Sequence, residues 1–401
     1  MEDENDNNQM TDNLINKALE GFQNQINNYT EKLLNEQINP KLDKYNHTLQ
    51  NQMENYTQKM ITKIINDKDF ILRKKEINLN EINIPPLISL KQLDNTNYLI
   101  NLILQYLSNS HYLISYFFNP QKENKILQNS KNNPNGTYLC PIFLKLLDNL
   151  WKNNIYQPKE IHEILKKLMK NDYNSLNPGQ ILNFIISELH KELISSNDFL
   201  EKPDGNFDEK KGYENFCNYF NYYKSKLSVE FFATIEIIKK PPHRPNFYLF
   251  EATPIIEIYL DNINGPVLSL ENNFKDLFKN YNEQMNQGYI KKSIFNIANQ
   301  LIININRGNN QKTFSYPKIL ESKSLVDNNY DLGKYDLFCV IMKENNNFNN
   351  KYYAYIKNFI NNNWYEYKDE KIRLVNDENG IVNKKNALLL IYQKQTIHKN
   401  N

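Results

Sequence analysis

Residues 335–342 read YDLFCVIM, and residues 352–356 read YYAYI. Both runs are short, rich in aromatic and β-branched residues and bounded by polar segments, which is typical of β-strands. Comparable runs recur through the second half of the chain, at residues 231–238, 246–250, 255–260, 301–305, 364–367 and 387–392. We therefore predict a mostly antiparallel sheet, interrupted by helical spacing only near residues 274–281 and by a surface loop at residues 345–350.

Helical spacing dominates the part of the chain that precedes these runs. Residues 97–118 and 141–193 repeat apolar side chains every three or four positions, as expected of amphipathic helices. Residues 195–212 are predicted to form a surface loop, because they include Pro203-Asp204-Gly205. Helices followed by a sheet indicate an α+β fold, with a helical lobe at 87–195 and a sheet lobe at 228–395 inside one domain at 85–397.

Residues 1–84 are predicted to be an N-terminal α-helical extension. Apolar residues alternate spacings of four and three over residues 15–33, and the pattern resumes at residues 42–60 after an interruption at Pro40. Such spacing gives a helix one apolar stripe, as in a coiled coil. The stripe either packs on the chain's own domain or docks a partner, and deletion of residues 1–80 distinguishes the two, because only the first lowers thermal stability.

Composition excludes several classes of protein. The chain has 48 Lys+Arg and 46 Asp+Glu, a formal net charge of +2, which argues against direct DNA binding and leaves RNA contact to a place within a complex. The acidic start at residues 1–6 is unlike a secretory signal, and no apolar run approaches a membrane span. We therefore expect a soluble intracellular protein with no membrane contact.

Motifs for cofactors and metals are incomplete. The ten glycines form no phosphate-binding loop, and the three cysteines form no CxxC pair, so we expect no cofactor, no zinc and no disulfide framework. His162-Glu163 opens like a zinc-binding HExxH helix, but Lys166 stands where the second histidine would be. Cys140, Cys217 and Cys339 lie among apolar or aromatic neighbours, which favours inert core thiols.

Seven segments in order resemble the ubiquitin-specific proteases, the papain-like ubiquitin carboxyl-terminal hydrolases. The first box, GLxNxGNTCY, resembles residues 89–98, and the trailing LQxL resembles residues 104–107. Later boxes resemble the segments at 301–307, 316–317, 335–342, 351–355, 364–369 and 387–392. The resemblance implies a papain-like fold in which the helical lobe carries the cysteine nucleophile and the sheet lobe carries the histidine.

The chain departs from this family at the residues that perform catalysis. Asn97 stands at the nucleophile's position, Lys351 at the general base, Lys368 at the residue that orients the base, and Gln92 at the oxyanion position. An alternative register gives the nucleophile's place to Tyr98. Asparagine is no nucleophile of this kind, and lysine, with a pKa of about 10.4, is a poor base at neutral pH. The resemblance therefore predicts a pseudo-deubiquitinase with no catalytic residues.

A narrower resemblance concerns the branch of the family that has lost catalysis and belongs to the spliceosomal tri-snRNP. Residues 231–243 contain no cysteine where active relatives begin a zinc-bearing region, and the first box ends in Asn97-Tyr98. The resemblance implies a scaffold with spliceosomal protein partners, in the nucleus rather than the cytoplasm. The alternatives are a ubiquitin-binding pseudo-deubiquitinase, a structural subunit of another large assembly, and an active cysteine protease with a relocated thiol.

Overall fold

The computed structural model divides the chain into two compact units, residues 1–71 and 72–401. In the first unit the structure describes six exposed helical residues, Gly21, Gln23, Asn24, Asn27, Asn28 and Lys32. In the second it describes residues 89–91, 98–119, 138–152, 156–169, 177–194, 201–260, 267–271, 274, 284–285, 288–308, 313–325, 333–344, 351–382 and 386–395. The apolar positions of the predicted N-terminal stripe lie outside the described residues.

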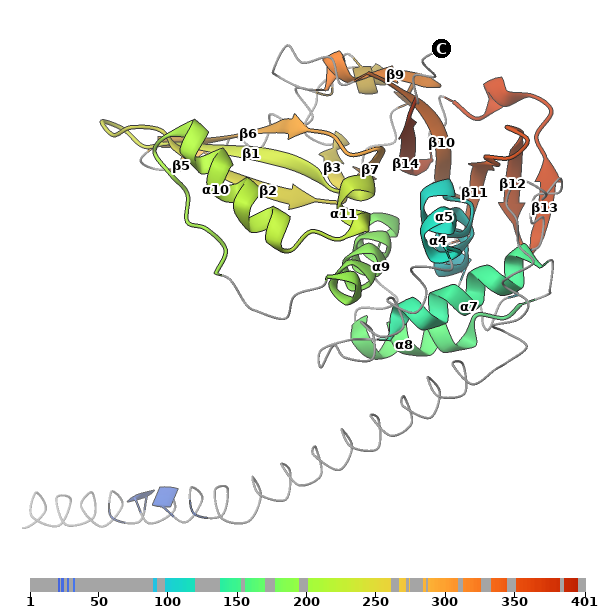
Figure 1. Cartoon of the computed structure of the whole chain (residues 1–401), viewed down its shortest axis with the longest axis horizontal. Helices are drawn as coiled ribbons and strands as arrows, with labels where there is room; N and C mark the ends of the chain where they lie inside the picture. The colour runs from blue at the N-terminus through green and yellow to red at the C-terminus, as the bar shows by residue number, and fades with distance from the viewer. Residues whose placement is uncertain are drawn as a thin grey trace, which may run out of the picture. The chain divides into compact units, whose positions relative to one another are not determined.

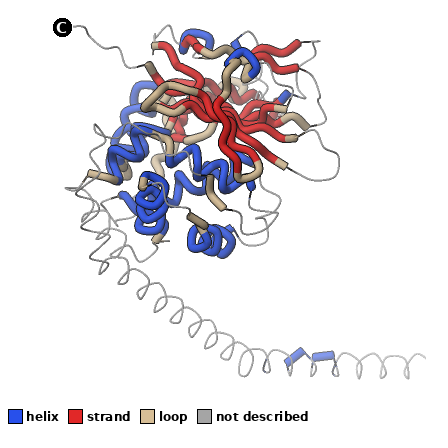
Figure 2. The backbone as a smooth tube through the Cα atoms, turned by 90° about the vertical axis from the view of Figure 1, so that its right-hand side faces the viewer, coloured by secondary structure: helices blue, strands red, loops and turns tan. Residues whose placement is uncertain are grey.

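Five helices of the second unit follow the helical spacing of the sequence. They are α4 (Tyr98–Ser108), α5 (His111–Phe117), α7 (Leu139–Trp151), α8 (Lys159–Met169) and α9 (Pro178–Leu193). Helix α4 is buried along residues 99–108, because it packs against α7, α9 and a strand of the sheet lobe. Figure 1 shows these five helices gathered below the strands, and in Figure 2 most helical segments of this unit lie on one side of the strands, with short ones on the other. No described helix is both long and apolar enough to cross a membrane.

Two further helices correct the expectation of a loop at residues 195–212 and of strands from residue 229. Helix α10 (Glu209–Tyr222) begins inside the predicted loop, and α11 (Lys226–Phe231) precedes the first strand. Asp208 caps α10 by accepting a hydrogen bond from the Lys211 amide at 3.0 Å. The helix forms because Tyr213 and Phe216 pack against Phe250 of the sheet beneath, with ring centroids 5.2 and 6.1 Å apart.

The strands form two principal sheets. Both are mostly antiparallel, as predicted. The four-stranded sheet has the order β2-β1-β6-β5 and the larger sheet the order β13-β12-β11-β10-β14-β7-β3, with β9 paired to β10. The first set is β1 (Ala233–Lys240), β2 (Phe247–Thr253), β5 (Gln284–Met285) and β6 (Gly288–Asn296). The second is β3 (Ile256–Tyr259), β7 (Gln300–Asn306), β9 (Ile319–Glu321), β10 (Lys334–Lys343), β11 (Tyr352–Lys357), β12 (Trp364–Lys368), β13 (Lys371–Leu374) and β14 (Ala387–Lys394).

Two strand pairs are parallel. Strand β3 runs parallel to β7, and β4 (Val267–Ser269) pairs in parallel with β8 (Thr313–Ser315). The other pairs in the two principal sheets are antiparallel. The helical lobe together with a mostly antiparallel sheet lobe gives the predicted α+β, papain-like architecture.

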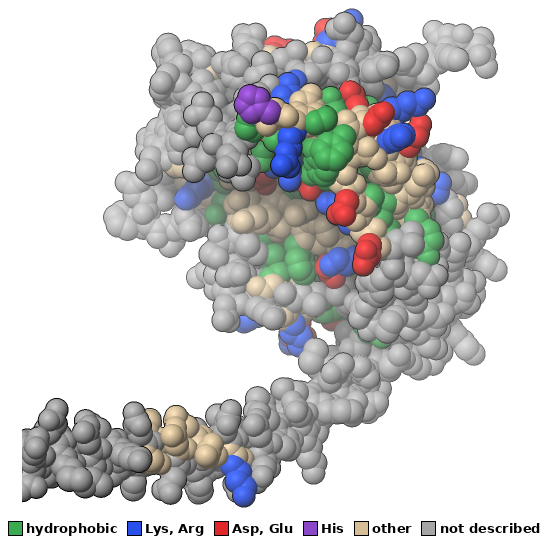
Figure 3. Space-filling view, turned by 90° about the vertical axis from the view of Figure 1, so that its left-hand side faces the viewer, with side chains coloured by type: hydrophobic (Ala, Val, Ile, Leu, Met, Phe, Trp, Pro, Cys, Tyr) green, Lys and Arg blue, Asp and Glu red, His purple; other side chains and the backbone are tan. Residues whose placement is uncertain are grey.

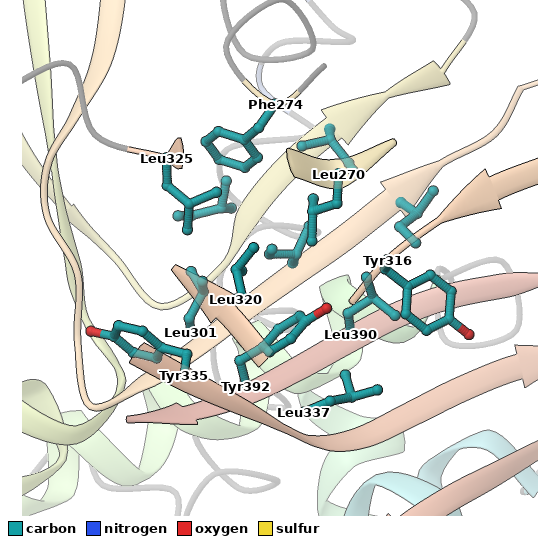
Figure 4. Close-up of a cluster of buried hydrophobic side chains, with 14 of the residues drawn as sticks. Leu270, Phe274, Leu301, Tyr316, Leu320, Leu325, Tyr335, Leu337, Leu390 and Tyr392 are labelled. Atoms are coloured by element: carbon teal, nitrogen blue, oxygen red, sulfur yellow. The ribbon is translucent and has the colours of Figure 1, made fainter. Parts of the chain in front are cut away.

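The main core lies where both sheets meet, and it is rich in tyrosine (Figure 4). Tyr316, Tyr335 and Tyr392 are at most 1 % exposed. Each phenol donates a hydrogen bond to a backbone carbonyl, namely Ile381 at 2.7 Å, Ala298 at 3.0 Å and Pro317 at 2.8 Å. These bonds let the rings fill the core without leaving a buried hydroxyl unsatisfied.

A buried polar network joins the helical lobe to the sheet lobe. The Tyr106 hydroxyl of α4 donates to the Gln300 side chain of β7, whose amide donates to Ser110 at 2.7 Å. Nearby, the Asn358 amide after β11 donates to the Asn109 side chain at 3.2 Å. Because such groups are costly to bury unpaired, this network fixes α4 and the residues after it against β7 and the segment after β11.

Candidate functional site

A small pocket lies between helix α4 and the end of the β12–β13 hairpin. Its cavity volume is about 20 Å3, close to the space that a single water molecule needs. Its lining comes from the segment before α4, from α4, from β11 and from the end of β12 with its turn: Ser89, Leu90, Tyr98, Asn101, Leu102, Gln105, Tyr352, Tyr367, Lys368, Asp369 and Glu370. The pocket thus brings the first and the later family-like segments together.

One face of α4 forms the helical wall of the pocket. Tyr98, Asn101 and Gln105 are three and four residues apart, which places them on one side of the helix. Two hydrogen bonds fix the Asn101 side chain. Its amide donates to the Lys91 carbonyl at 3.2 Å, and its oxygen lies 2.9 Å from His162 Nε2. Asn97 and Gln92 lie outside the described residues, so Tyr98 is the described residue at the start of this face.

Lys368 and Asp369 line the opposite wall, and each forms an ion pair with a residue outside the pocket lining. Lys351 Nζ lies 3.7 Å from Asp369 Oδ1, and Lys368 Nζ lies 2.5 Å from Glu344 Oε1. The hydrogen bond to Glu344 raises the pKa of Lys368 above its ordinary value, and the ammonium also sits 5.5 Å from the centre of the Tyr353 ring. Lys368 is therefore protonated at neutral pH. Both lysines are directed at carboxylates, which makes them unsuitable as proton acceptors.

The phenols of the sheet wall are also in their neutral form. Burial raises the pKa of Tyr352 and of Tyr367 above the ordinary value for tyrosine. A hydrogen bond from Asn109 opposes this rise at Tyr367. A protonated phenol is a weak nucleophile, so these groups shape the pocket and offer hydrogen bonds.

All three cysteines of the chain are described, and none lines the pocket. Cys140 lies in the first turn of α7 and Cys339 in β10, both fully buried. Burial raises the pKa of both thiols. Cys217 lies half-buried on α10. The structure thus gives the relocated-thiol alternative no cysteine at this pocket.

Four of the six histidines are described, and none of these lines the pocket. His162 is buried behind Asn101, and His190 contacts Ser225 with 2.6 Å between Nδ1 and Oγ. His243 occupies the turn after β1 with a φ of 60°. Among the described residues no three His, Cys, Asp or Glu side chains gather into a metal-binding set.

The described side chains of the pocket are suited to donating and accepting hydrogen bonds. Cysteine-protease chemistry needs a thiolate, a base within hydrogen-bond reach and oxyanion donors, whereas the described part of this pocket offers phenols, amides and paired ions. Sequence reasoning had placed Lys351 and Lys368 here, but it missed Glu344 and Tyr352. Glu344 directly follows β10, and its amide donates to the carbonyl of Lys351, the residue before β11. Its position between two predicted strands was the feature of the sequence that could have identified it.

Comparisons with known proteins agree with this architecture. The profile of the family described as "Ubiquitin carboxyl-terminal hydrolase" matches residues 88–392, while a search of the curated proteins found no match. Among solved structures, the yeast SAGA DUB module with an Sgf73 mutant matches at 15 % identity and a TM-score of 0.57, covering 82 % of this chain and 75 % of that chain.

Two further matches contain ubiquitin or a derivative of it. The SAGA Ubp8/Sgf11/Sus1/Sgf73 DUB module bound to monoubiquitin matches at 13 % identity and a TM-score of 0.57, covering 82 % of this chain and 75 % of that chain. The same module bound to ubiquitin aldehyde has the same identity and TM-score, with coverage of 82 % and 76 %. At such low identity these similarities establish the fold alone.

Proposed function

The chain belongs to the ubiquitin carboxyl-terminal hydrolase family, and on this premise we propose that it is a member without peptidase activity that works as a protein-interaction module. One observation carries the proposal. The positions that match the family's general base and its orienting residue are Lys351 and Lys368, and both ammonium groups are held in ion pairs with carboxylates. A lysine fixed in this way neither accepts a proton from a thiol nor orients an imidazole.

The nucleophile position supports the same proposal. The pocket face of α4 starts at Tyr98, and Asn97 precedes it. Neither residue is a thiol, and the three cysteines lie in α7, α10 and β10. We therefore propose Asn97 or Tyr98, Lys351 and Lys368 as the degenerate triad, with Gln92 at the oxyanion position.

We expect the purified full-length chain to release no fluorophore from a ubiquitin C-terminal fluorogenic substrate, and to form no adduct with a cysteine-reactive ubiquitin probe. The physical reason is that the described residues lining the pocket include no thiol and no imidazole. An active ubiquitin-specific protease serves as the positive control. Turnover or labelling above that of a heat-denatured sample would contradict the proposal.

Restoring the three triad residues by substitution tests whether other parts of the site are also unsuited to catalysis. Tyr98→Cys or Asn97→Cys, each combined with Lys351→His and Lys368→Asp, should give little activity. Gln92 is one methylene longer than the asparagine of the family's first box, and an oxyanion donor that is out of place costs about 3 kcal/mol of transition-state stabilisation. Full activity of either triple variant would show that the remaining site is competent and that only the three side chains were lost.

Retained ubiquitin binding is a second candidate function. It is favoured by the fold, because solved chains of this fold are reported in complexes with monoubiquitin and ubiquitin aldehyde. Those chains are components of a four-protein module, which also suits the proposal that this chain is one subunit of a larger assembly. Titration of the labelled chain with monoubiquitin separates a ubiquitin-binding pseudo-deubiquitinase from a scaffold that has lost ubiquitin.

We propose pre-mRNA splicing, within the tri-snRNP and hence the nucleus, as the setting of the scaffold. Its support is the sequence of the dead nucleophile box together with the cysteine-free segment that forms β1 and the following turn. On the face in Figure 3, described basic and acidic side chains are interspersed, a pattern that suits protein contacts better than a bare phosphate backbone.

Depletion of the protein should make introns accumulate in unspliced transcripts, because a missing scaffold subunit weakens assembly of the particle. The tagged chain should also co-sediment with tri-snRNP proteins in nuclear extract. A tagged unrelated member of the family with an intact triad is the control for nonspecific sedimentation. Normal splicing after depletion, with the chain in another assembly, would overturn this setting and leave the scaffold role itself standing.

A further inference from the structure

The turn between β12 and β13 has an unfavourable backbone. It consists of Asp369 and Glu370, with φ values of 46° and 60°, between the paired residues Lys368 and Lys371. Two-residue hairpin turns with positive φ at both positions usually carry Asn-Gly, because a side chain disfavours the left-handed region. Two bulkier residues hold this geometry here, so the surrounding contacts must keep the turn in place.

Two ion pairs fix the turn from one side. Asp369 is held by Lys351 at the start of β11, and Lys368, the residue before the turn, is held by Glu344 at the end of β10. The two anchors are themselves joined, because the Glu344 amide donates to the Lys351 carbonyl at 2.8 Å. Glu344 is only 11 % exposed, so its pair with Lys368 is screened less than an ordinary surface pair.

The other side of the turn faces the pocket. Asp369 and Glu370 line it together with Tyr98 and Asn101 of α4. The turn is thus one boundary of a cavity of about 20 Å3, which admits nothing much larger than water. A shift of this short turn changes the pocket directly, whereas the wall on α4 is fixed by buried packing.

We propose that the Asp369-Glu370 turn is a latch that closes the pocket against α4, and that the ion pairs Lys351–Asp369 and Lys368–Glu344 keep it closed. Loss of these pairs lets the turn relax from its left-handed backbone and opens the α4 face to solutes. Lys351 and Lys368, which match two catalytic positions of the family, thus hold the latch closed. This inference does not rest on ubiquitin binding, because it concerns the motion of the chain alone.

Hydrogen exchange of the full-length chain measures the latch itself. The double variant Lys351→Gln with Glu344→Gln should speed amide exchange of the peptide covering residues 367–372 by about tenfold or more. The matched control is Lys334→Gln with Glu321→Gln, which removes an ion pair of 3.2 Å at another strand pair. Unchanged exchange at 367–372 overturns the latch, and so does an equal acceleration in β14, which indicates general loosening.

Thiol labelling measures whether the latch controls access to α4. Tyr98→Cys is made in a Cys217→Ser background, where the two native thiols that remain are buried. We expect the latch double variant to raise the iodoacetamide labelling rate of the installed thiol at least fivefold, and the Lys334/Glu321 control to leave it unchanged. Equal labelling rates with the latch double variant and with the unaltered latch overturn the proposal. Both readouts are independent of ubiquitin and of peptidase activity, so their failure is distinct from failure of the proposed function.

Discussion

Replacing Glu192 with alanine should lower the free energy of unfolding by about 3 kcal/mol, since a buried amide left without a partner costs about 1–3 kcal/mol and two are affected. Glu192 is 1 % exposed and accepts hydrogen bonds from the Leu139 and Cys140 amides at 2.5 and 3.0 Å. These are the first two residues of α7. The carboxylate thus caps the helix with a charge that its N-terminus favours.

Urea denaturation of the full-length chain measures this effect, with the two tryptophans, Trp151 at the end of α7 and Trp364 in β12, as fluorescent reporters. Glu192→Gln should cost less than alanine, because one acceptor oxygen remains. Glu163→Ala is the matched control, since Glu163 is exposed on α8 and 4.0 Å from Lys159, and such surface pairs contribute about 0–1 kcal/mol. A Glu192→Ala midpoint equal to that of Glu163→Ala would rule out the capping role.

The N-terminal cap of α7 also shows why part of the fold could not be predicted from the sequence. The apolar spacing of residues 141–151 predicts α7, yet Tyr138 at its N-cap offers no side-chain bond. The cap comes from Glu192, 53 residues further along the chain from Leu139. A local pattern reports which face of a helix is buried, but it carries no information about a partner brought near only by folding.

The same distinction explains α10 and β6. Helix α10 was missed because its aromatic residues are separated by Glu, Asn and Cys. Their packing partners, Phe250 and Phe295 of the sheet, are brought near only by folding. Strand β6 was missed because Lys291 and Lys292 interrupt its alternation, although register pairs both with isoleucines of β1. The strands that were predicted, such as β10 and β14, are continuous apolar runs buried on both faces.

At the candidate site, the order of family-like segments was enough to bring Lys351 and Lys368 to one hairpin. Their partners were not predictable, because the pairing with Asp369 and Glu344 depends on strand register and on a turn with positive φ. The departures from the family's residues therefore predict which catalytic groups are missing. Only the three-dimensional arrangement shows what these lysines contact instead.

Acidification from pH 7 to pH 4 should cost the domain about 3 kcal/mol of stability through His190 alone, the free energy that corresponds to a pKa fall from 6.5 to about 4. Burial is the larger cause of this low pKa and the charge of Lys191 the smaller. The ring packs 4.8 Å from Phe232. Ser225 accepts from the Leu227 amide at 3.1 Å, so its hydroxyl proton is available to the neutral Nδ1 of His190.

The sign of the effect follows from the direction of the pKa change. The unfolded chain binds the proton near pH 6.5 and the folded chain only near pH 4. The contribution of neutral His190 to the free energy of unfolding is therefore fully present above pH 6.5 and is lost as the pH falls from 6.5 to about 4. His190→Gln should flatten this fall in urea titrations at pH 7, 6, 5 and 4. An unchanged slope in His190→Gln would show that other groups, such as His111, whose pKa is also lowered by burial, account for the acid sensitivity.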